Sequence, residues 1–188
     1  MNYQIKTING ETLIDGEYDS LRQCVERNCH NLSGANLYGA DLSRANLSGV
    51  NLYGADLSGA KGMNKYMTTP MYILLDQIGP IRAYKLVNSQ NTGIYNPGLV
   101  YEIGKTITVN AWDENENQSC GAGINLASLD WCLKEWKVGY KILLCEFNKE
   151  NIICIPVGSD GKFRVNSCTP IAELDLAQYG IITEKAQA

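Results

Sequence analysis

Apolar residues return at every fifth position over residues 30–59. The segment divides into six units, HNLSG, ANLYG, ADLSR, ANLSG, VNLYG and ADLSG, with leucine third in each. A period of five fits neither the 3.6 residues of an α-helical turn nor the alternation of a strand. We therefore expect the chain to turn after each unit, so that four units close one coil and the segment makes about one and a half coils.

These units resemble the A-[DN]-L-x-x units of the pentapeptide-repeat family, whose members form a right-handed quadrilateral β-helix. The resemblance implies that one leucine and one small residue of each unit are buried, with His30 occupying the first of the small-residue positions. The implied leucines are Leu32, Leu37, Leu42, Leu47, Leu52 and Leu57, and the implied small residues are Ala35, Ala40, Ala45, Val50 and Ala55.

So short a solenoid needs cover at both ends, because about three stacked layers are usually required for stability. Asn9-Gly10 predicts a hairpin with strands at residues 3–8 and 11–15. Ser20 opens a helix with the capping box Ser20-Leu21-Arg22-Gln23. A hairpin and helix before the repeats resemble the N-terminal cap of pentapeptide-repeat proteins from phages and bacteria. Another part of the chain, or a second copy, must cover the other end.

The five-residue period ends within KGMNKYMTTP, residues 61–70. We expect a hairpin and capping helix at 1–29, a β-helix at 30–62, a linker at 63–79 and an α+β domain at 80–188, a mixed fold overall. A helix is predicted at 128–136 and a short one at 172–178. The expected strands of this domain are 81–87, 100–103, 106–110, 140–147, 152–156 and 162–166.

Charge and hydropathy exclude two classes of partner. The net charge is −4. Residues 1–62 contain 5 basic and 7 acidic residues, and the rest of the chain contains 11 basic and 13 acidic residues. Neither part has the excess of basic residues that is typical of a nucleic-acid binder. No signal sequence precedes the hairpin, and no apolar run approaches the roughly 18 residues of a membrane span. We expect a cytoplasmic protein, located in the host cytoplasm if a phage encodes it.

The seven cysteines predict reduced, mostly buried thiols, because their number is odd and no C-x-x-C pair occurs. Cys120 is the best candidate for a reactive thiol, since it precedes a glycine turn. A zinc site is not expected with one histidine. The acidic loop WDENENQ lacks the ordered spacing of a calcium loop, so we expect no metal.

The segment Ser119-Cys120-Gly121-Ala122-Gly123-Ile124-Asn125 has the character of a ligand-binding loop. Two glycines allow close approach, and a helix with its N-cap at Asn125 or Ser128 would offer N–H groups to an anion. We expect Arg164 to point away from Phe163 and Val165, either to solvent or a cleft or to an ion pair with Asp160 or Glu173. Lys162 is a further nearby cation. The expected ligand-binding residues are Tyr84, Lys85, Gly121, Gly123, Asn125, Ser128 and Arg164.

Residues 80–175 are similar to the ADP-ribosyltransferase fold through GAGINLAS, the helix after it and the strand ILLCEF. The resemblance implies an NAD site. Tyr84-Lys85 replaces the His-Gly or Arg-Gly pair that holds the ribose, and Asn125 replaces the residue beside the nicotinamide. Glu173 is the only counterpart of the catalytic glutamate. The segments 120–125, 155–156 and 161–165 also resemble small domains of phage proteins.

We therefore expect a non-catalytic, cofactor-free binding protein of phage type. It would capture a nucleotide-derived anionic ligand, such as a host defence signal, or a host protein. The repeat would serve as a scaffold for a homodimer or higher homo-oligomer. One alternative is a diverged ADP-ribosyltransferase using NAD. Another is a mimic of DNA that inhibits a DNA-binding enzyme. Such mimicry needs regularly spaced negative charge, and the repeat has only Asp41 and Asp56, whose charge Arg44 partly cancels.

Overall fold

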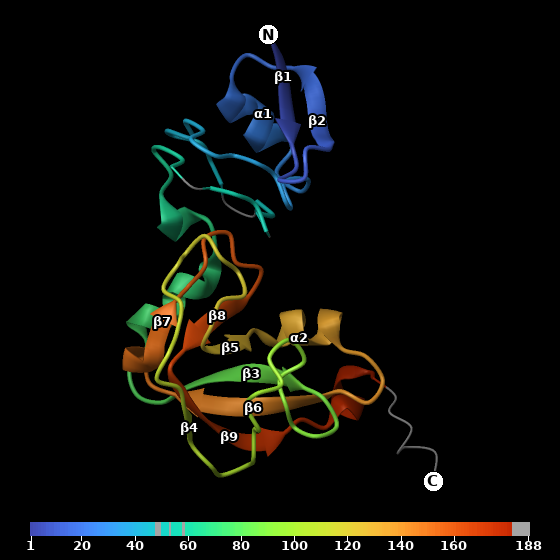
Figure 1. The fold of residues 1–188 in the computed structure, drawn as a ribbon, viewed down its shortest axis with the longest axis vertical. Coiled ribbons are helices and arrows are strands. Elements are labelled where there is room, and N and C mark those ends of the chain that lie inside the picture. Colours follow the sequence, from blue (N-terminus) through green and yellow to red (C-terminus); the bar gives the residue numbers. More distant parts are fainter. Residues whose placement is uncertain (48–49, 53, 58, 182–188) are drawn as a thin grey trace. The chain divides into compact units, whose positions relative to one another are not determined.

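The computed structural model describes residues 1–47, 50–52, 54–57 and 59–181 (Figure 1). It has two compact units. The repeat unit comprises Met1–Ile73, Glu114–Gly121 and Cys154–Phe163, and the sheet unit comprises Leu74–Asp113, Ala122–Ile153 and Arg164–Ala188. This division differs from the domain bounds expected above, because two segments from the second half of the chain belong with the repeats.

The repeat unit begins with the expected hairpin and helix. Strands β1 (Asn2–Lys6) and β2 (Thr12–Glu17) pair antiparallel, and Gly10 takes a φ of 87° in the turn between them. Helix α1 (Leu21–Arg27) follows, and the Ser20 side chain accepts a hydrogen bond from Gln23 N at 3.1 Å. The Gln23 side chain caps Asp19 N at 3.0 Å, one residue earlier than the expected capping box requires.

Backbone pairings in the repeat segment join residues 20 positions apart. Parallel bridges link Asn36 with Asp56 and Asp41 with Lys61. Leu37 N donates to Asp56 O at 2.9 Å. Successive coils are therefore spaced by four five-residue units, whereas the quadrilateral form and its right-handedness stay predictions.

The side chains of the repeat follow the five-residue period. All six leucines are at most 4% exposed. Ala35, Val50 and Ala55 are buried, and Ala40 and Ala45 are half-buried. His30 is exposed, unlike the small residues whose position it was expected to share.

The chain covers the repeat with two of its own parts. Ile5 and Val25, from the hairpin and α1, share a core cluster with the repeat leucines, and so does Val157, from the segment Cys154–Phe163. Asn36 N donates to Lys6 O at 2.7 Å, so the hairpin continues into the first coil. Figure 1 shows the hairpin and α1 on one side of the repeat segment and the segment Cys154–Phe163 reaching it from another side. Two regions distant in sequence thus supply the missing cover.

The expected linker is structured. It contains the 3₁₀ helices η1 (Lys65–Met67) and η2 (Pro70–Asp76). Thr68 is buried, and its hydroxyl donates to Lys65 O at 2.7 Å and accepts from Gly158 N at 3.2 Å. These bonds attach the connector to the loop that carries Val157.

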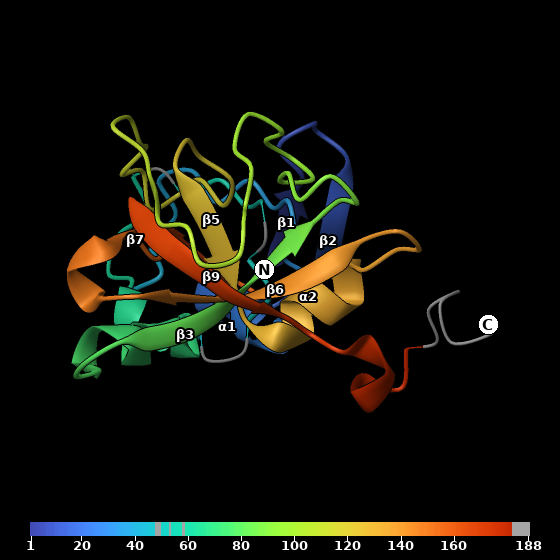
Figure 2. The same cartoon turned by 90° about the horizontal axis from the view of Figure 1, so that it is seen from below.

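The second half of the chain is built on a seven-stranded sheet of order β4-β9-β6-β3-β5-β8-β7. β3 pairs antiparallel with β6 and β5, and β6 pairs antiparallel with β9. The strands cross at an angle in Figure 2, as strands of a twisted sheet do. The bounds are β3 Ile81–Val87, β4 Ile107–Thr108, β5 Ile124–Ala127, β6 Lys141–Phe147, β7 Ile152–Cys154, β8 Lys162–Val165 and β9 Ser167–Glu173.

Three helical elements accompany these strands. They are α2 (Leu129–Glu135), η3 (Lys149–Asn151) and η4 (Leu176–Tyr179). Trp131 and Cys132 of α2 pack with Leu86 and Ile142 of the sheet and with Leu176. This cluster is the core on one side of β3 and β6.

Several expected elements differ from the observed ones. Residues 100–103 form no strand and contribute only the bridge of Val100 to Thr92. β5 and β9 were not expected, and β9 occupies the first two residues of the predicted C-terminal helix. All four residues of β8 are buried, so the expectation that Arg164 could face solvent is wrong.

Candidate functional site

Four of the seven expected ligand-binding residues lie in contact as two pairs in the sheet unit. Lys85 Nζ, on β3, donates to Asn125 O, on β5, at 2.8 Å. The same ammonium lies 4.9 Å from the ring centroid of Tyr101, whose side chain is 1% exposed. Lys85 itself is half-buried. Its charge therefore already stabilises the junction of β3 with the strand that follows the glycine turn.

Side chains from three other parts of the sheet unit surround Gly123 in the glycine turn. Gly123 is buried with a φ of 122°, and a Cβ built on it would lie 3.5 Å from Trp112 Cβ and 3.8 Å from both Arg164 Cδ and Ile153 Cδ1. Arg164 is 0% exposed. A ligand that reached its guanidinium through this turn would have to displace the packed side chains.

The turn leads into β5 and not directly into a helix. Helix α2 begins at Leu129, after β5 has ended at Ala127. Ser128 is its N-cap, as one of the two expected assignments had it, but its side chain makes no capping bond. Its hydroxyl donates instead to Asp130 Oδ1 at 2.5 Å. The helix N-terminus is therefore not the continuation of the glycine turn.

The remaining expected residues lie apart from the Lys85–Asn125 contact. Tyr84 neighbours Lys85 on β3, so the two side chains point to opposite faces of the sheet, and Tyr84 packs with the α2 cluster. Burial raises the pKa of its hydroxyl. Gly121 belongs to the repeat unit. The sheet unit thus groups Lys85 with Asn125 and Gly123 with Arg164, and separates Tyr84 and Ser128 from them.

The hydrogen bond from Ser128 to Asp130 predicts that the free energy of unfolding depends on pH. The hydrogen bond from Ser128 and that from Lys134 (3.1 Å) lower the pKa of Asp130 below its ordinary value of 3.8. A lowered pKa stabilises the fold above 3.8, and this contribution is lost as the pH falls through the folded-state value. We expect Asp130→Asn to cost under about 1 kcal/mol at pH 7, since the pair is exposed. Urea unfolding should show a smaller difference in stability between the wild type and Asp130→Asn at about pH 2. An equal loss of stability at both pH values would contradict this prediction.

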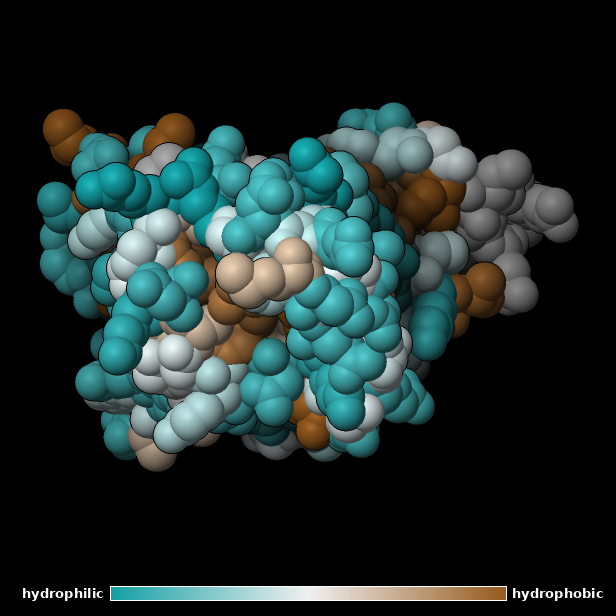
Figure 3. All heavy atoms as spheres, turned by 90° about the horizontal axis from the view of Figure 1, so that it is seen from above, coloured by the Kyte–Doolittle hydropathy of each residue, from teal (hydrophilic) through white to brown (hydrophobic). Residues whose placement is uncertain are grey.

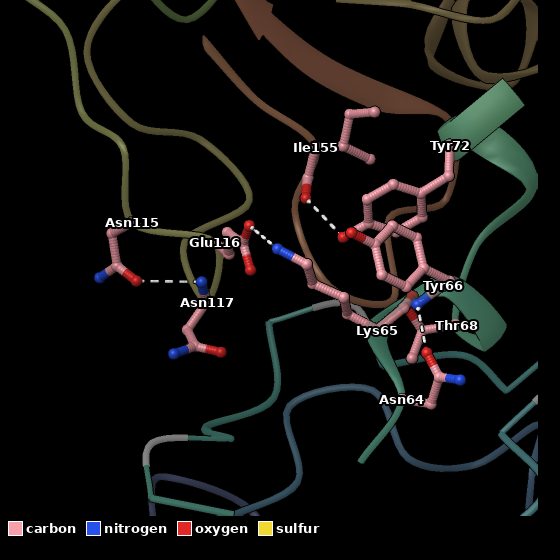
Figure 4. A network of polar contacts seen from close by, with 9 residues as sticks. All are labelled: Asn64, Lys65, Tyr66, Thr68, Tyr72, Asn115, Glu116, Asn117 and Ile155. Atoms are coloured by element: carbon pink, nitrogen blue, oxygen red, sulfur yellow. Dashed lines mark hydrogen bonds and ion pairs between the residues drawn. The ribbon is translucent and has the colours of Figure 1, made fainter. Parts of the chain in front are cut away.

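Residues 114–118 of the acidic loop belong to the repeat unit, where Glu116 is bonded to Lys65 (Figure 4). Glu116 Oε1 accepts from Lys65 Nζ at 2.5 Å, and Glu116 O accepts from Val157 N at 2.8 Å. Tyr72 OH donates to Ile155 O at 3.5 Å, and burial raises the pKa of Tyr72. Within the described part of the chain, no group of three histidine, cysteine or acidic side chains could hold a metal ion. The loop therefore helps to attach residues 154–158 to η1 and η2.

Glu173, which the ADP-ribosyltransferase resemblance offered as its candidate catalytic glutamate, forms an ion pair at the end of β9. Its Oε2 lies 3.4 Å from Lys141 Nζ, and both side chains are partly exposed. Lys141 Nζ also donates to Asn91 Oδ1 at 3.2 Å. These contacts are those of a partly exposed pair of charges at the ends of two neighbouring strands, β6 and β9.

Sequence reasoning missed Tyr101, Trp112 and Val157 as parts of these environments. Tyr101 and Trp112 lie in segments without regular structure, where no periodicity indicates that Tyr101 is buried or that Trp112 lies beside Gly123. Val157 is separated from the repeat by about 100 residues of sequence, so no local pattern connects them. Only the shortness of the repeat indicated that some distant segment had to cover it.

The face seen in Figure 3 is mostly polar, with apolar side chains showing as small separate areas. Apolar residues scattered in this way are normal on a protein surface. None of the helices among the described residues is both long and apolar enough to cross a membrane.

Comparison with known proteins identifies the repeat segment alone. Residues 31–61 match the family described as pentapeptide repeats (8 copies). No curated protein and no solved structure matches the chain. The match agrees with the family resemblance of the leucine units and leaves the sheet unit without a counterpart.

Proposed function

We propose that this chain is a non-catalytic adaptor that binds a partner protein, with the repeat unit as its scaffold. The match of residues 31–61 to pentapeptide repeats supports a scaffold or protein-interaction role. The observation that carries the proposal is the packing of Val157 into the repeat core. Because of it, the repeat is incorporated into a unit that the second half of the chain completes. More specifically, we propose that the adaptor is a phage factor that binds a host protein in the host cytoplasm.

The internal use of the expected site residues favours an adaptor over a ligand-binding protein. Lys85 bonds to Asn125 and contacts Tyr101, and side chains surround Gly123. Glu173 pairs with Lys141, which does not favour transfer of ADP-ribose. The Asp41 carboxylate accepts from Ser43 N at 3.0 Å, a local turn contact that adds nothing to the DNA-mimic alternative.

The adaptor would act through exposed residues of the sheet unit. Affinity capture with the full chain tests this. Tyr95 (68% exposed, sheet unit) and Tyr38 (71% exposed, repeat unit) are matched in residue type and exposure. We expect a captured host protein to be lost in a set of sheet-unit variants that includes Tyr95→Asp and Val138→Asp, and to be kept in Tyr38→Asp. Retention in every sheet-unit variant, or loss only in Tyr38→Asp, would contradict the proposal.

Capture of an anionic nucleotide-like molecule is the second candidate, favoured by the half-buried Lys85 ammonium, which bonds to the strand after the glycine turn. Thermal unfolding with ADP-ribose, NAD or cyclic nucleotides separates the two. A ligand at 100 times its Kd stabilises a fold by about 2.7 kcal/mol. The adaptor proposal expects no shift, whereas a shift that Lys85→Met removes would favour ligand capture. Transfer of label from NAD, lost in Glu173→Gln, would favour the transferase.

A homodimer or higher homo-oligomer stays a prediction. It was expected because a short repeat with open ends would need a second copy to cover them. In the described residues the hairpin, α1 and Val157 all pack on the repeat within one chain. A second copy is therefore not needed to complete this core.

A further inference from the structure

One cysteine differs from the others in its surroundings. All seven cysteines lie in the part of the chain that the structure describes, and Cys120 alone is exposed, while Cys29 is half-buried. Burial raises the pKa of the Cys24 thiol and raises that of Cys132 to about 12. The thiolate is the reactive form of cysteine, so these buried groups are poor nucleophiles.

A buried cation points at the exposed sulfur. Lys162, at the start of β8, is 3% exposed, and its Nζ donates to Cys120 Sγ at 3.4 Å within the repeat unit. The surrounding turn is fixed, because Gly161 N donates to Ser159 Oγ at 3.2 Å and Ser159 Oγ donates to Lys162 O. An ammonium group shielded from water stabilises an adjacent negative charge more strongly than one at the surface.

We propose that Cys120 and Lys162 form a peroxide-reactive thiol site. The Lys162 ammonium lies 3.4 Å from the Cys120 sulfur, where it can donate a proton to the departing hydroxide, and the exposed position of Cys120 admits the oxidant. The other cysteines lack this combination, since five are buried and Cys29 is only half-buried. The pair is a site of modification and does not depend on the adaptor function.

The reaction balances with hydrogen peroxide as the only oxidant. The Cys120 thiolate attacks one peroxide oxygen, so that an S–O bond forms and the O–O bond breaks. Sulfur loses two electrons and the peroxide gains them. The hydroxide that leaves takes a proton from the Lys162 ammonium and becomes water. The products are a sulfenic acid at Cys120 and a neutral amine at Lys162, which regains its proton from solvent.

The test uses the full chain with hydrogen peroxide and a cyclic diketone that labels sulfenic acids, followed by mass spectrometry of peptides. We expect Cys120 to oxidise about tenfold faster than glutathione at the same pH and to be labelled ahead of Cys29. Lys162→Met should slow oxidation about tenfold, and Lys162→Arg should retain most of the rate, since charge-assisted bonds are the strong ones. Cys120→Ser should abolish this label.

The outcome that overturns the proposal is a Cys120 rate no greater than that of glutathione, or a rate unchanged in Lys162→Met. Circular dichroism verifies that the lysine variants fold. If Lys162→Met does not fold, the comparison of Cys120 with glutathione in the wild-type chain decides by itself. Exposure without activation would give Cys120 the rate of an ordinary free thiol.

Discussion

Replacing Gly62 with alanine is expected to destabilise the repeat unit by driving a methyl group into the neighbouring coil. A Cβ at residue 62 would lie 2.0 Å from Ser43 Oγ and 2.4 Å from Ser43 Cα, and the φ of Gly62 is 69°. Because Cα belongs to the backbone, the coil itself would have to move. Overpacking and the left-handed conformation together should cost about 3 kcal/mol or more. Urea unfolding followed by circular dichroism measures this loss.

Gly59 provides the matched control for this substitution. Its φ is also 69°, but among the residues that the structure describes a Cβ there would meet only Gly39 atoms, at 3.8 Å. Gly59→Ala should therefore cost about 1 kcal/mol, from backbone strain alone. Equal losses for the two variants would show that coils of the repeat do not approach as closely as the structure has them.

The second large effect is expected at Gly158. A Cβ there would lie 2.4 Å from Leu52 Cβ, so a methyl group would push the covering loop away from the buried leucine. The bond from Gly158 N to the buried Thr68 hydroxyl would be strained as well. We expect Gly158→Ala to lower the free energy of unfolding by about 3 kcal/mol. The unfolding midpoint in urea reports the change.

Gly39→Ala separates the packing effect from the backbone effect. Gly39 and Gly158 share a φ of 65°, yet a Cβ on Gly39 would have no atom of the described residues within 4 Å. The loss for Gly39→Ala should again be about 1 kcal/mol. If both variants lost the same amount, residues 154–163 would not be the cover of the repeat in solution.

The burial of the repeat leucines could be predicted from sequence because the pattern repeats locally. The five-residue period specifies which side chain of each unit points inward, and all six leucines are buried. Strand β3 also has the expected bounds, Ile81–Val87, because an apolar run is limited there by Pro80 and Asn88. Both inferences use only neighbouring residues.

Elements that depend on distant contacts could not be predicted. The four residues of β5 are too few to show a period, and they follow glycines, so they resembled a loop. Arg164 was expected to face solvent or a cleft because strand residues alternate, but every residue of β8 is buried. In the candidate site, the Lys85–Asn125 contact depends on the pairing of β3 with β5, which sequence spacing does not specify.

The attachment of Val157 to the repeat core constrains how the chain can be made. A ribosome releases the six leucine units long before it releases the segment Cys154–Phe163. Until then Leu52 lacks the covering loop around Gly158, and the core of the repeat unit stays incomplete. Contacts so far apart in sequence form slowly, because a long loop must close first. The N-terminal third of this protein can therefore reach its final stability only after nearly all of the chain has been synthesised.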